Sequence, residues 1–415
     1  MNFNNRKNLL LFALAAETFF ASYGLLIGDQ AAVVSILYLL ASCFFIFSIL
    51  LIRSADHPGF QYSKKDFYLK WSLFLLMIVL AFITSKYWLE QIPLDPDFAD
   101  MLPIIKVMNE RFLYGHWKQV YEPIPEIWNG TKPIYLPAMW LPYLPAVALK
   151  IDIRWVTVCA TLISFTIILF LIRIRENRYF GYVYLAIAAV LFWWIFARND
   201  VHSLISMSEE GVVIFYFVIL TLAIISDNAF LMGIAASCCL LSRYSMIGWL
   251  IPCLVFYGSR KEYCRLLVFC LTGLTCVLLF FLIPFGYQTL GQMIALPAQY
   301  VNFAKHVWEF TPEVFWLNPG LAKFFGSHGT HALHITLLTA SFAIPFLFMC
   351  FCLWQKKWDL QNINLACFKL SLVVFYQLID VPYGYLFYTS SFVSLVIAAR
   401  LLSVEVWEFG SLEVN

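Results

Sequence analysis

Apolar runs of roughly twenty residues recur along the whole chain, and this feature limits most strongly what the chain can fold into. Each run is long enough to cross the ~30 Å hydrocarbon core of a bilayer as an α-helix. Charged residues make up only 13% of the 415 residues, whereas a soluble globular protein carries about 25%. The sequence therefore predicts an all-α polytopic membrane protein with a single membrane domain over residues 1–415.

Four clusters of basic residues between the runs orient the chain, because short cytoplasmic loops carry an excess of Lys and Arg. Placing these clusters in the cytoplasm predicts about 12–13 transmembrane helices with both termini inside. The expected spans cover about 8–27, 31–52, 68–87, 155–172, 180–197, 212–226, 229–243, 246–258, 266–285, 335–354, 365–379 and 387–403.

Two long segments, 88–153 and 286–334, then face outward, to the periplasm or the lumen. The first also contains a Pro-rich apolar run at 134–149, in which prolines disfavour a continuous helix. We expect this run to form an outward or re-entrant helix. If it does cross the membrane, one half of the 229–258 pair cannot.

Other functional classes lack support in the sequence. The formal charge of +2 is too balanced to indicate a nucleic-acid partner. Cysteines lie almost entirely inside apolar runs, so they form neither a disulfide framework nor a CxxC metal site. The chain has no P-loop, no nucleotide-binding GxGxxG and no nucleophile elbow.

Two aspartates, Asp97 and Asp100, begin a predicted amphipathic helix in the first outward segment, whose apolar positions between Met101 and Leu113 follow helical spacing. An aspartate in this place can cap the helix N-terminus. It can also act as a general base toward a hydroxyl at the membrane surface. Both interpretations stay open.

Arg243 lies between two short apolar halves, where an ionisable residue is costly and is a candidate for function. Glu209 and Glu210 open a predicted span; they either favour the helix N-terminus or contact an acceptor or a metal. Histidines recur at every third position before another span, at His328, His331 and His334. Interface histidines are the simpler explanation of this spacing, and a metal site is the alternative.

Several motifs occur in a fixed order along residues 68–260. They are Asp97-Phe98 or Asp100, Gly115, Tyr121, Tyr135-Leu136-Pro137, Asn199-Asp200-Val201-His202 and Ser242-Arg243-Tyr244. This order resembles the GT-C superfold of integral-membrane glycosyltransferases, and most of all the branch that uses polyprenol-phosphate-mannose. The chain departs from that branch in having Tyr-Leu-Pro for its Tyr-Pro-Pro and in lacking its Gly-Gln pair.

The resemblance implies an inverting transfer of one sugar, a hexose such as mannose, from a polyprenyl-phosphate donor to a glycan, lipid or protein acceptor on the outward face. Asp97 or Asp100 would be the base. Arg243, Arg198 and His202 would bind the donor phosphate, and Tyr135, Glu209 and Glu210 the sugar or acceptor. No residues are assigned as metal ligands, although a divalent cation is compatible with this chemistry. The expected location is the cell inner or plasma membrane rather than the endoplasmic reticulum.

Two other functions remain open. One is a transporter or lipid flippase, which commonly shows inverted repeats and polar residues at the bilayer midplane. The sequence shows no apparent repeat, and its ionisable residues gather on one side. The other is a polysaccharide polymerase or ligase, a class that often has its large outward loop late in the chain, as at 286–334.

Two single-cysteine variants, Asp97→Cys and His202→Cys, test whether the expected site can assemble. Each is made in a protein whose native cysteines have been replaced. We expect both positions to react with a membrane-impermeant thiol reagent from the outward side. Labelling from opposite sides of the membrane would contradict a shared catalytic compartment and would favour the transporter.

Overall fold

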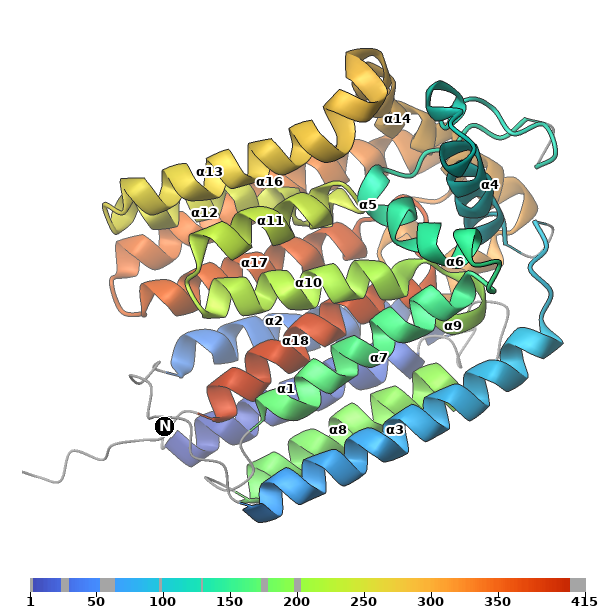
Figure 1. Cartoon of the computed structure of the whole chain (residues 1–415). Helices are drawn as coiled ribbons and strands as arrows, with labels where there is room; N and C mark the ends of the chain where they lie inside the picture. Colours follow the sequence, from blue (N-terminus) through green and yellow to red (C-terminus); the bar gives the residue numbers. More distant parts are fainter. Residues whose placement is uncertain are drawn as a thin grey trace, which may run out of the picture.

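The computed structural model describes residues 3–23, 30–52, 64–96, 99–127, 130–172, 178–197 and 203–403. These residues are almost entirely helical, and their only β-pairing is an isolated bridge between Ile124 and Thr131. Long helices run side by side in one bundle, and short helices gather at one end of it (Figure 1). We call the end at which α4 (Met101–Leu113) lies the loop end.

Seven of the described helical stretches are long and apolar enough to cross a membrane. They support the predicted class, a multi-pass α-helical membrane protein. They comprise α2 (Ala31–Leu51), α3 (Lys64–Gln91), α7 (Arg154–Leu171), α8 (Arg178–Ala197), α13 (Tyr263–Val277) with its continuation η5 (Leu278–Leu282), α16 (Thr330–Gln355) and α18 (Phe387–Leu402).

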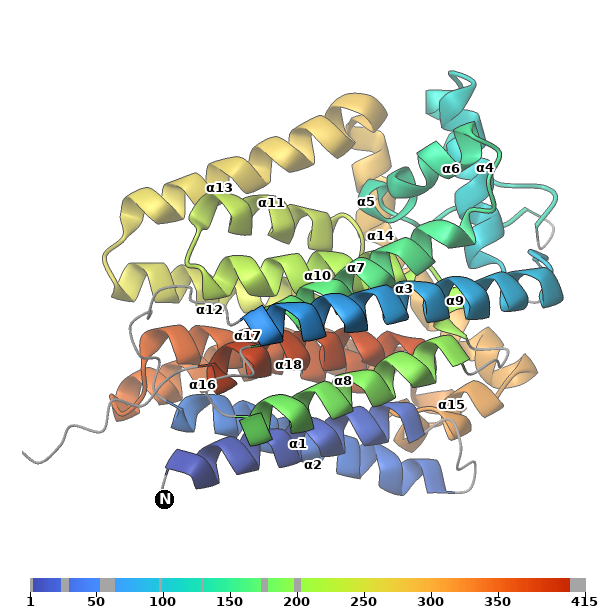
Figure 2. The ribbon, with the colours of Figure 1, turned by 60° about the horizontal axis from the view of Figure 1, so that its bottom comes forward.

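The other five predicted spans are also helices, and they run alongside the seven (Figures 1 and 2). They are α1 (Phe3–Tyr23), α10 (Glu210–Ile225), α11 (Ala229–Leu240), α12 (Ile247–Ser259) and α17 (Leu360–Gln377). The short 3₁₀ turn η4 (Tyr244–Met246) separates α11 from α12.

The Pro-rich run is divided into three short pieces: α5 (Pro137–Trp140), η3 (Leu141–Tyr143) and α6 (Leu144–Ala148). A proline stands in the first turn of each piece, where its missing N–H has no intrahelical partner to lose. A five-residue helix rises only about 7.5 Å, so none of the pieces can span a bilayer.

The second long segment is more helical than the sequence predicts. It contains α14 (Ile283–Phe310), which is kinked where Gly286 adopts a φ of 78°, and the short elements α15 (Glu313–Leu317), η6 (Ala322–Phe324) and η7 (Ser327–Gly329). Two further short helices, α9 (Leu204–Met207) and η8 (Gly384–Leu386), precede α10 and α18. Helices α10 and α18 therefore both begin at the loop end.

Helix α18 lies at the centre of the bundle, since 94% of its apolar stretch is buried. Only 11% of the corresponding stretch of α3 or α13 is buried, so these two helices lie at the periphery and present apolar side chains to the surroundings. Such a distribution is expected where lipid, rather than water, surrounds the outer helices.

A fully buried ion pair joins the first helix to the last two. Lys369, in the middle of α17, donates to Glu17 Oε1, to the Ser390 carbonyl oxygen at 2.8 Å and to Ser390 Oγ at 2.5 Å. The second carboxylate oxygen of Glu17 accepts from Ser394 Oγ at 2.8 Å. All three ammonium donors and both carboxylate oxygens therefore have partners, and the pair fixes α1 against α17 and α18.

Breaking this pair should destabilise the fold. Glu17→Gln or Lys369→Met should each cost about 3–5 kcal/mol, because the remaining charge stays buried without its partner. The double variant should lose much less, since it buries no charge. Thermal unfolding in detergent measures this, with Lys86→Ala as the matched control.

Lys86 belongs to an exposed pair in which 4.0 Å separates Lys86 Nζ from Glu90 Oε1. We expect its loss to change stability by less than about 0.5 kcal/mol. Equal stability losses for Lys369→Met and Lys86→Ala would show that the buried pair does not hold the helices together.

Candidate functional site

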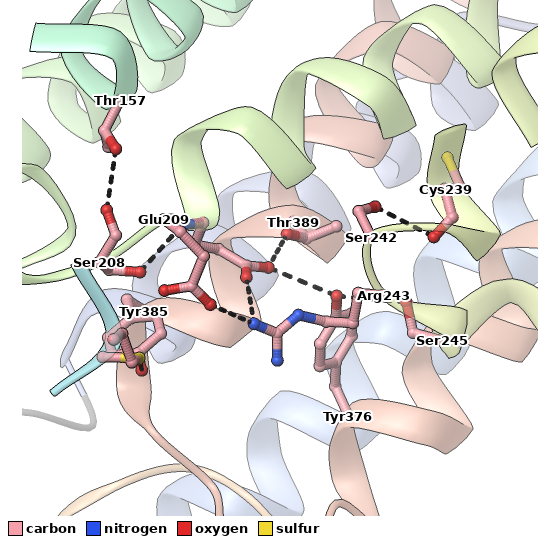
Figure 3. A network of polar contacts seen from close by, with 12 residues as sticks. Thr157, Ser208, Glu209, Cys239, Ser242, Arg243, Ser245, Tyr376, Tyr385 and Thr389 are labelled. Carbon is pink, nitrogen blue, oxygen red and sulfur yellow. Dashed lines mark hydrogen bonds and ion pairs between the residues drawn. The ribbon is translucent and has the colours of Figure 1, made fainter. Parts of the chain in front are cut away.

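Two loop-end turns bring a basic side chain against two acidic ones (Figure 3). Glu209 and Glu210 begin α10, and Arg243 occupies the turn between α11 and η4. Arg243 Nη2 lies 2.8 Å from Glu209 Oε1 and 3.0 Å from Glu210 Oε2. Both carboxylates are buried, and the Arg243 side chain is 18% exposed. We call these three residues the ion triad.

Hydroxyl groups from the last two helices complete one side of the triad. Glu210 Oε1 accepts from Thr389 Oγ1 at 2.5 Å and from the Tyr376 hydroxyl at 3.5 Å. Ser245 Oγ in turn donates to the Tyr376 hydroxyl at 3.3 Å. Ser208 Oγ accepts from the Glu210 backbone N–H at 2.9 Å, which fixes the start of α10. The triad is therefore held by α10, α17, α18 and η4 together.

The triad nevertheless has unused hydrogen-bonding capacity. Arg243 contacts the carboxylates through Nη2 alone; its Nε is buried without a hydrogen-bond partner among the described residues, and so is Glu209 Oε2. Buried polar groups in native proteins almost always have partners. An unpaired donor and an unpaired acceptor within one ion cluster make the triad a candidate position for a polar ligand.

Asp100 lies beside the triad and differs from an ordinary cap. It occupies the N-cap position of α4, yet its side chain accepts no capping hydrogen bond. Burial raises the pKa of the Asp100 carboxyl to about 6, and the charge of Glu209 adds to the effect. A carboxyl with this pKa is a stronger base than usual and is still mostly ionised at neutral pH.

Tyrosines from the first long segment and from the turn before α18 lie near these charges. Tyr135, from the first segment, is buried; burial and the charges of Asp100 and Glu209 raise its pKa, so its hydroxyl remains a donor. The rings of Tyr383 and Tyr385 stack with centroids 5.7 Å apart. Tyr385 also donates to Met101 Sδ at 3.1 Å, which ties η8 to α4. Tyrosine rings and their hydroxyl groups therefore lie near the acidic groups of Asp100 and Glu209.

Five of the predicted site residues are therefore brought into one neighbourhood: Asp100, Tyr135, Glu209, Glu210 and Arg243. The other three, Asp97, Arg198 and His202, lie outside the described residues. Glu209 makes no cap through its side chain, and neither glutamate belongs to a metal-binding group of three or more His, Cys, Asp or Glu in the described part of the chain. Both are counter-ions of Arg243, which is a third role that the sequence did not indicate.

Other charged residues of the loop end have structural contacts. Arg111 donates to the carbonyl oxygens of Gln119, Glu122 and Pro123 at 2.6–2.9 Å and so holds that loop. His334 is buried and paired with Asp380, whereas His328 and His331 are exposed, so the three histidines do not converge.

Sequence reasoning missed several residues of the site and core. Tyr376 and Thr389 carry no signal, because a hydroxyl inside an apolar helix is common. Glu17 and Lys369 were detectable, since an ionisable residue in the middle of a predicted span is itself unusual.

Comparison with known proteins adds no relative: no family model matches the chain, and neither a curated protein nor a solved structure is significantly similar to it.

The raised pKa of Asp100 predicts how stability depends on pH. Its pKa of about 6 in the folded protein exceeds the ~3.9 of an unfolded aspartate. The stabilising contribution of the protonated form is thus complete below pH ~4 and is lost as the pH rises through about 6. Asp100→Asn stays neutral, so it should match the wild type near pH 4 and be up to about 2 kcal/mol more stable above pH 6, the partial exposure of Asp100 limiting the gain.

Thermal unfolding in detergent from pH 4 to pH 8 measures this difference. A constant offset between the two proteins across that range would contradict a desolvated Asp100 carboxyl.

Proposed function

We propose that the protein is an integral-membrane glycosyltransferase that transfers one hexose from a polyprenyl-phosphate donor to a hydroxyl of an acceptor, with inversion. The observation that carries the proposal is the incomplete ion triad: Arg243, whose Nε has no partner among the described residues, is paired with Glu209, and the charge of Glu209 acts in turn on Asp100, a carboxyl whose pKa is raised to about 6. An anion-binding group and a tuned base in one place are the two parts that sugar transfer from a phosphate donor requires.

In the proposed reaction, Asp100 removes the proton of the acceptor hydroxyl as its oxygen attacks the anomeric carbon. The bond between that carbon and the phosphate oxygen breaks, and its electron pair stays on the phosphate. Arg243 donates to the phosphate, as its negative charge develops, from an N–H that the carboxylates do not use, since a guanidinium presents several donors in one plane. Glu209 and Glu210 hold the guanidinium in place through Nη2.

The position of the site in the fold supports a lipid-linked donor. The triad lies where α10, α17 and α18 meet the loop end, so charged groups are placed next to apolar spans. A polyprenyl chain can then remain in the bilayer while its phosphate reaches Arg243. Tyr383, which is half-buried and stacks on Tyr385, offers a ring face and a hydroxyl that suit a sugar.

A second candidate is a polysaccharide ligase or polymerase, because that class often has a large outward segment late in the chain. The helices over residues 283–329 form such a segment here. A transporter is supported less well. The Glu17–Lys369 pair is a midplane charge of the kind that transporters use. However, all of its hydrogen-bonding groups are occupied within the protein, which leaves no free group for a cargo.

Release of isoprenyl phosphate from short-chain isoprenyl-phosphate hexoses, measured with the purified protein, tests the function. Asp100→Asn should lower kcat by about 10²–10⁴-fold, the usual contribution of a general base. Asp97→Asn is measured alongside, because the sequence allows either aspartate. The exposed carboxylate of Glu122 in the same segment gives the matched control, and Glu122→Gln should keep wild-type activity.

Full activity in both aspartate variants and in the double variant would refute the assignment of Asp97 or Asp100 as the base, whereas no release of isoprenyl phosphate by the wild-type protein would refute the proposed function. Consumption of a diphosphate-linked oligosaccharide, with no use of monophosphate donors, would identify the ligase instead. Movement of a lipid-linked sugar across liposomes without cleavage would identify a flippase.

A further inference from the structure

One guanidinium serves two buried carboxylates in the ion triad, so the triad carries an excess negative charge when both glutamates are ionised. Arg243 Nη2 lies 2.8 Å from Glu209 Oε1 and 3.0 Å from Glu210 Oε2, and the glutamate side chains are only 1% and 0% exposed. Two carboxylates that share one buried site favour a proton on one of them. A phosphate bound at Arg243 adds a further negative charge, which strengthens this preference.

The two glutamates differ in the hydrogen-bond donors that face them. Glu210 Oε1 accepts from Thr389 Oγ1 at 2.5 Å and from the Tyr376 hydroxyl at 3.5 Å, and Glu210 Oε2 faces Arg243. Donors at both oxygens favour the ionised form of Glu210. Glu209 Oε1 accepts from Arg243, whereas Glu209 Oε2 is buried without a hydrogen-bond partner among the described residues (Figure 3). Glu209 Oε2 is therefore the oxygen that can carry a proton with no donor opposing it.

The groups around Glu209 provide no other way to offset the charge of a phosphate. Burial raises the pKa of the Glu209 carboxyl, which precedes α10, and the charge of Arg243 opposes this effect. Arg243 is the cation that acts on Glu209 within the described part of the chain. Apart from Glu210, the other titratable groups that interact with Glu209 are one aspartate and five tyrosines: Asp100, Tyr135, Tyr143, Tyr300, Tyr383 and Tyr385. Tyrosine hydroxyls are neutral at neutral pH, and Asp100 must stay ionised to act as the base.

We propose that Glu209 takes up one proton when the phosphate of the lipid-linked donor binds, and that the resulting carboxylic acid donates from Oε2 to a phosphate oxygen. The proton comes from solvent and returns to solvent when the phosphate leaves. Glu209 Oε1 accepts from Arg243 Nη2 in both protonation states, and Glu210 keeps the negative charge that balances the guanidinium. The direct contact between Glu209 and Arg243 lets both groups reach one anion. This inference rests on the proposed function and makes Glu209 a second phosphate-binding residue.

Calorimetric titration of the wild-type protein, in buffers of different ionisation enthalpy, measures the protons that are taken up on binding. The ligand is a short-chain isoprenyl-phosphate hexose, a phosphodiester that keeps one negative charge from pH 6 to pH 8.5. We expect an uptake of about 0.5–1 proton per ligand near pH 7, and a Kd that rises by up to about tenfold per pH unit, because the complex binds more protons than the free protein. A Kd that stays constant over this range, with no proton uptake, would overturn the inference.

Asp100→Asn identifies the residue that takes up the proton, because Asp100 is the other acid here whose pKa of about 6 falls in this range. Proton uptake should persist in Asp100→Asn and disappear in Glu209→Gln. The exposed Glu122 again gives the matched control, and Glu122→Gln should keep the wild-type uptake. Uptake that is lost in Asp100→Asn and kept in Glu209→Gln would overturn the inference.

Two uncharged substitutions of Glu209 separate the hydrogen bond from the loss of charge. Glu209→Gln keeps an N–H donor in the place of the acid, whereas Glu209→Ala has none. Glu209→Gln should bind the ligand with a Kd that does not change with pH. Glu209→Ala should bind roughly tenfold to a hundredfold more weakly than Glu209→Gln, the effect of losing one charge-assisted hydrogen bond. Equal affinities of the two variants, once thermal unfolding shows that both are folded, would overturn the donor role of Glu209.

Three further titrations separate failure of this inference from failure of the proposed function. Weaker binding in Arg243→Gln, together with no proton uptake in the wild type, would reject the role of Glu209 and keep the phosphate site at Arg243. No binding of the isoprenyl-phosphate hexose to the wild-type protein would reject the proposed function itself. The matching isoprenyl alcohol should bind without proton uptake, and equal uptake with the alcohol would overturn the inference. Dimethyl phosphate should bind much more weakly than the donor; equal affinity would overturn the need for a lipid-linked phosphate.

Discussion

The buried interaction of one guanidinium with two carboxylates is the constraint on which the loop end depends. Removing either sign of charge would leave the other buried and unpaired, which costs several kcal/mol. The break between α11 and η4 must therefore stay opposite the start of α10, because Arg243 and Glu209 come from those two turns. Thr389 and Tyr376 reach the same carboxylate, so α17 and α18 are tied to it as well.

Helix α18 connects this site with the inner ion pair. Thr389 bonds Glu210 at the loop end, and the next residue, Ser390, bonds Lys369 and Glu17 within the bundle. The inner pair has partners for all its donors and acceptors, whereas Arg243 Nε and Glu209 Oε2 in the triad have none within the part of the chain that the structure describes. A complete network stabilises helix packing, and an incomplete one leaves capacity for a ligand. The two clusters thus separate a structural role from the binding role that we propose, along one helix.

The sequence predicts the parts of this architecture that depend on composition and local geometry. Twenty-residue apolar runs indicate the helices, and the prolines of 134–149 disfavour one continuous helix there, since both follow from backbone and bilayer dimensions. Burying the charge of Arg243 between two apolar halves of a predicted span costs free energy, and this cost indicates the candidate functional site. The pairing of Arg243 with Glu209 is not predictable in this way, because the two residues are 34 positions apart and only packing brings them together. Likewise, α14 contains several glutamines and does not read as an apolar run, although the fold makes it a long helix.

The two long segments act as one structure, and an aromatic cluster is the physical reason. The Phe285 ring, near the start of α14, lies 5.4 Å from the Tyr121 ring and 5.8 Å from the Trp140 ring, centroid to centroid. Aromatic contacts of this kind bury large apolar areas and fix ring geometry. They join the segment that carries Asp100 to the segment that carries Tyr300 and leads into His334. Carboxylates near the membrane surface are stronger bases when water is kept away from them, as the pKa of Asp100 illustrates. Helices that only cross the membrane would leave such groups at an open surface, so the packed outer segments are what allow this bundle to hold a desolvated charged site.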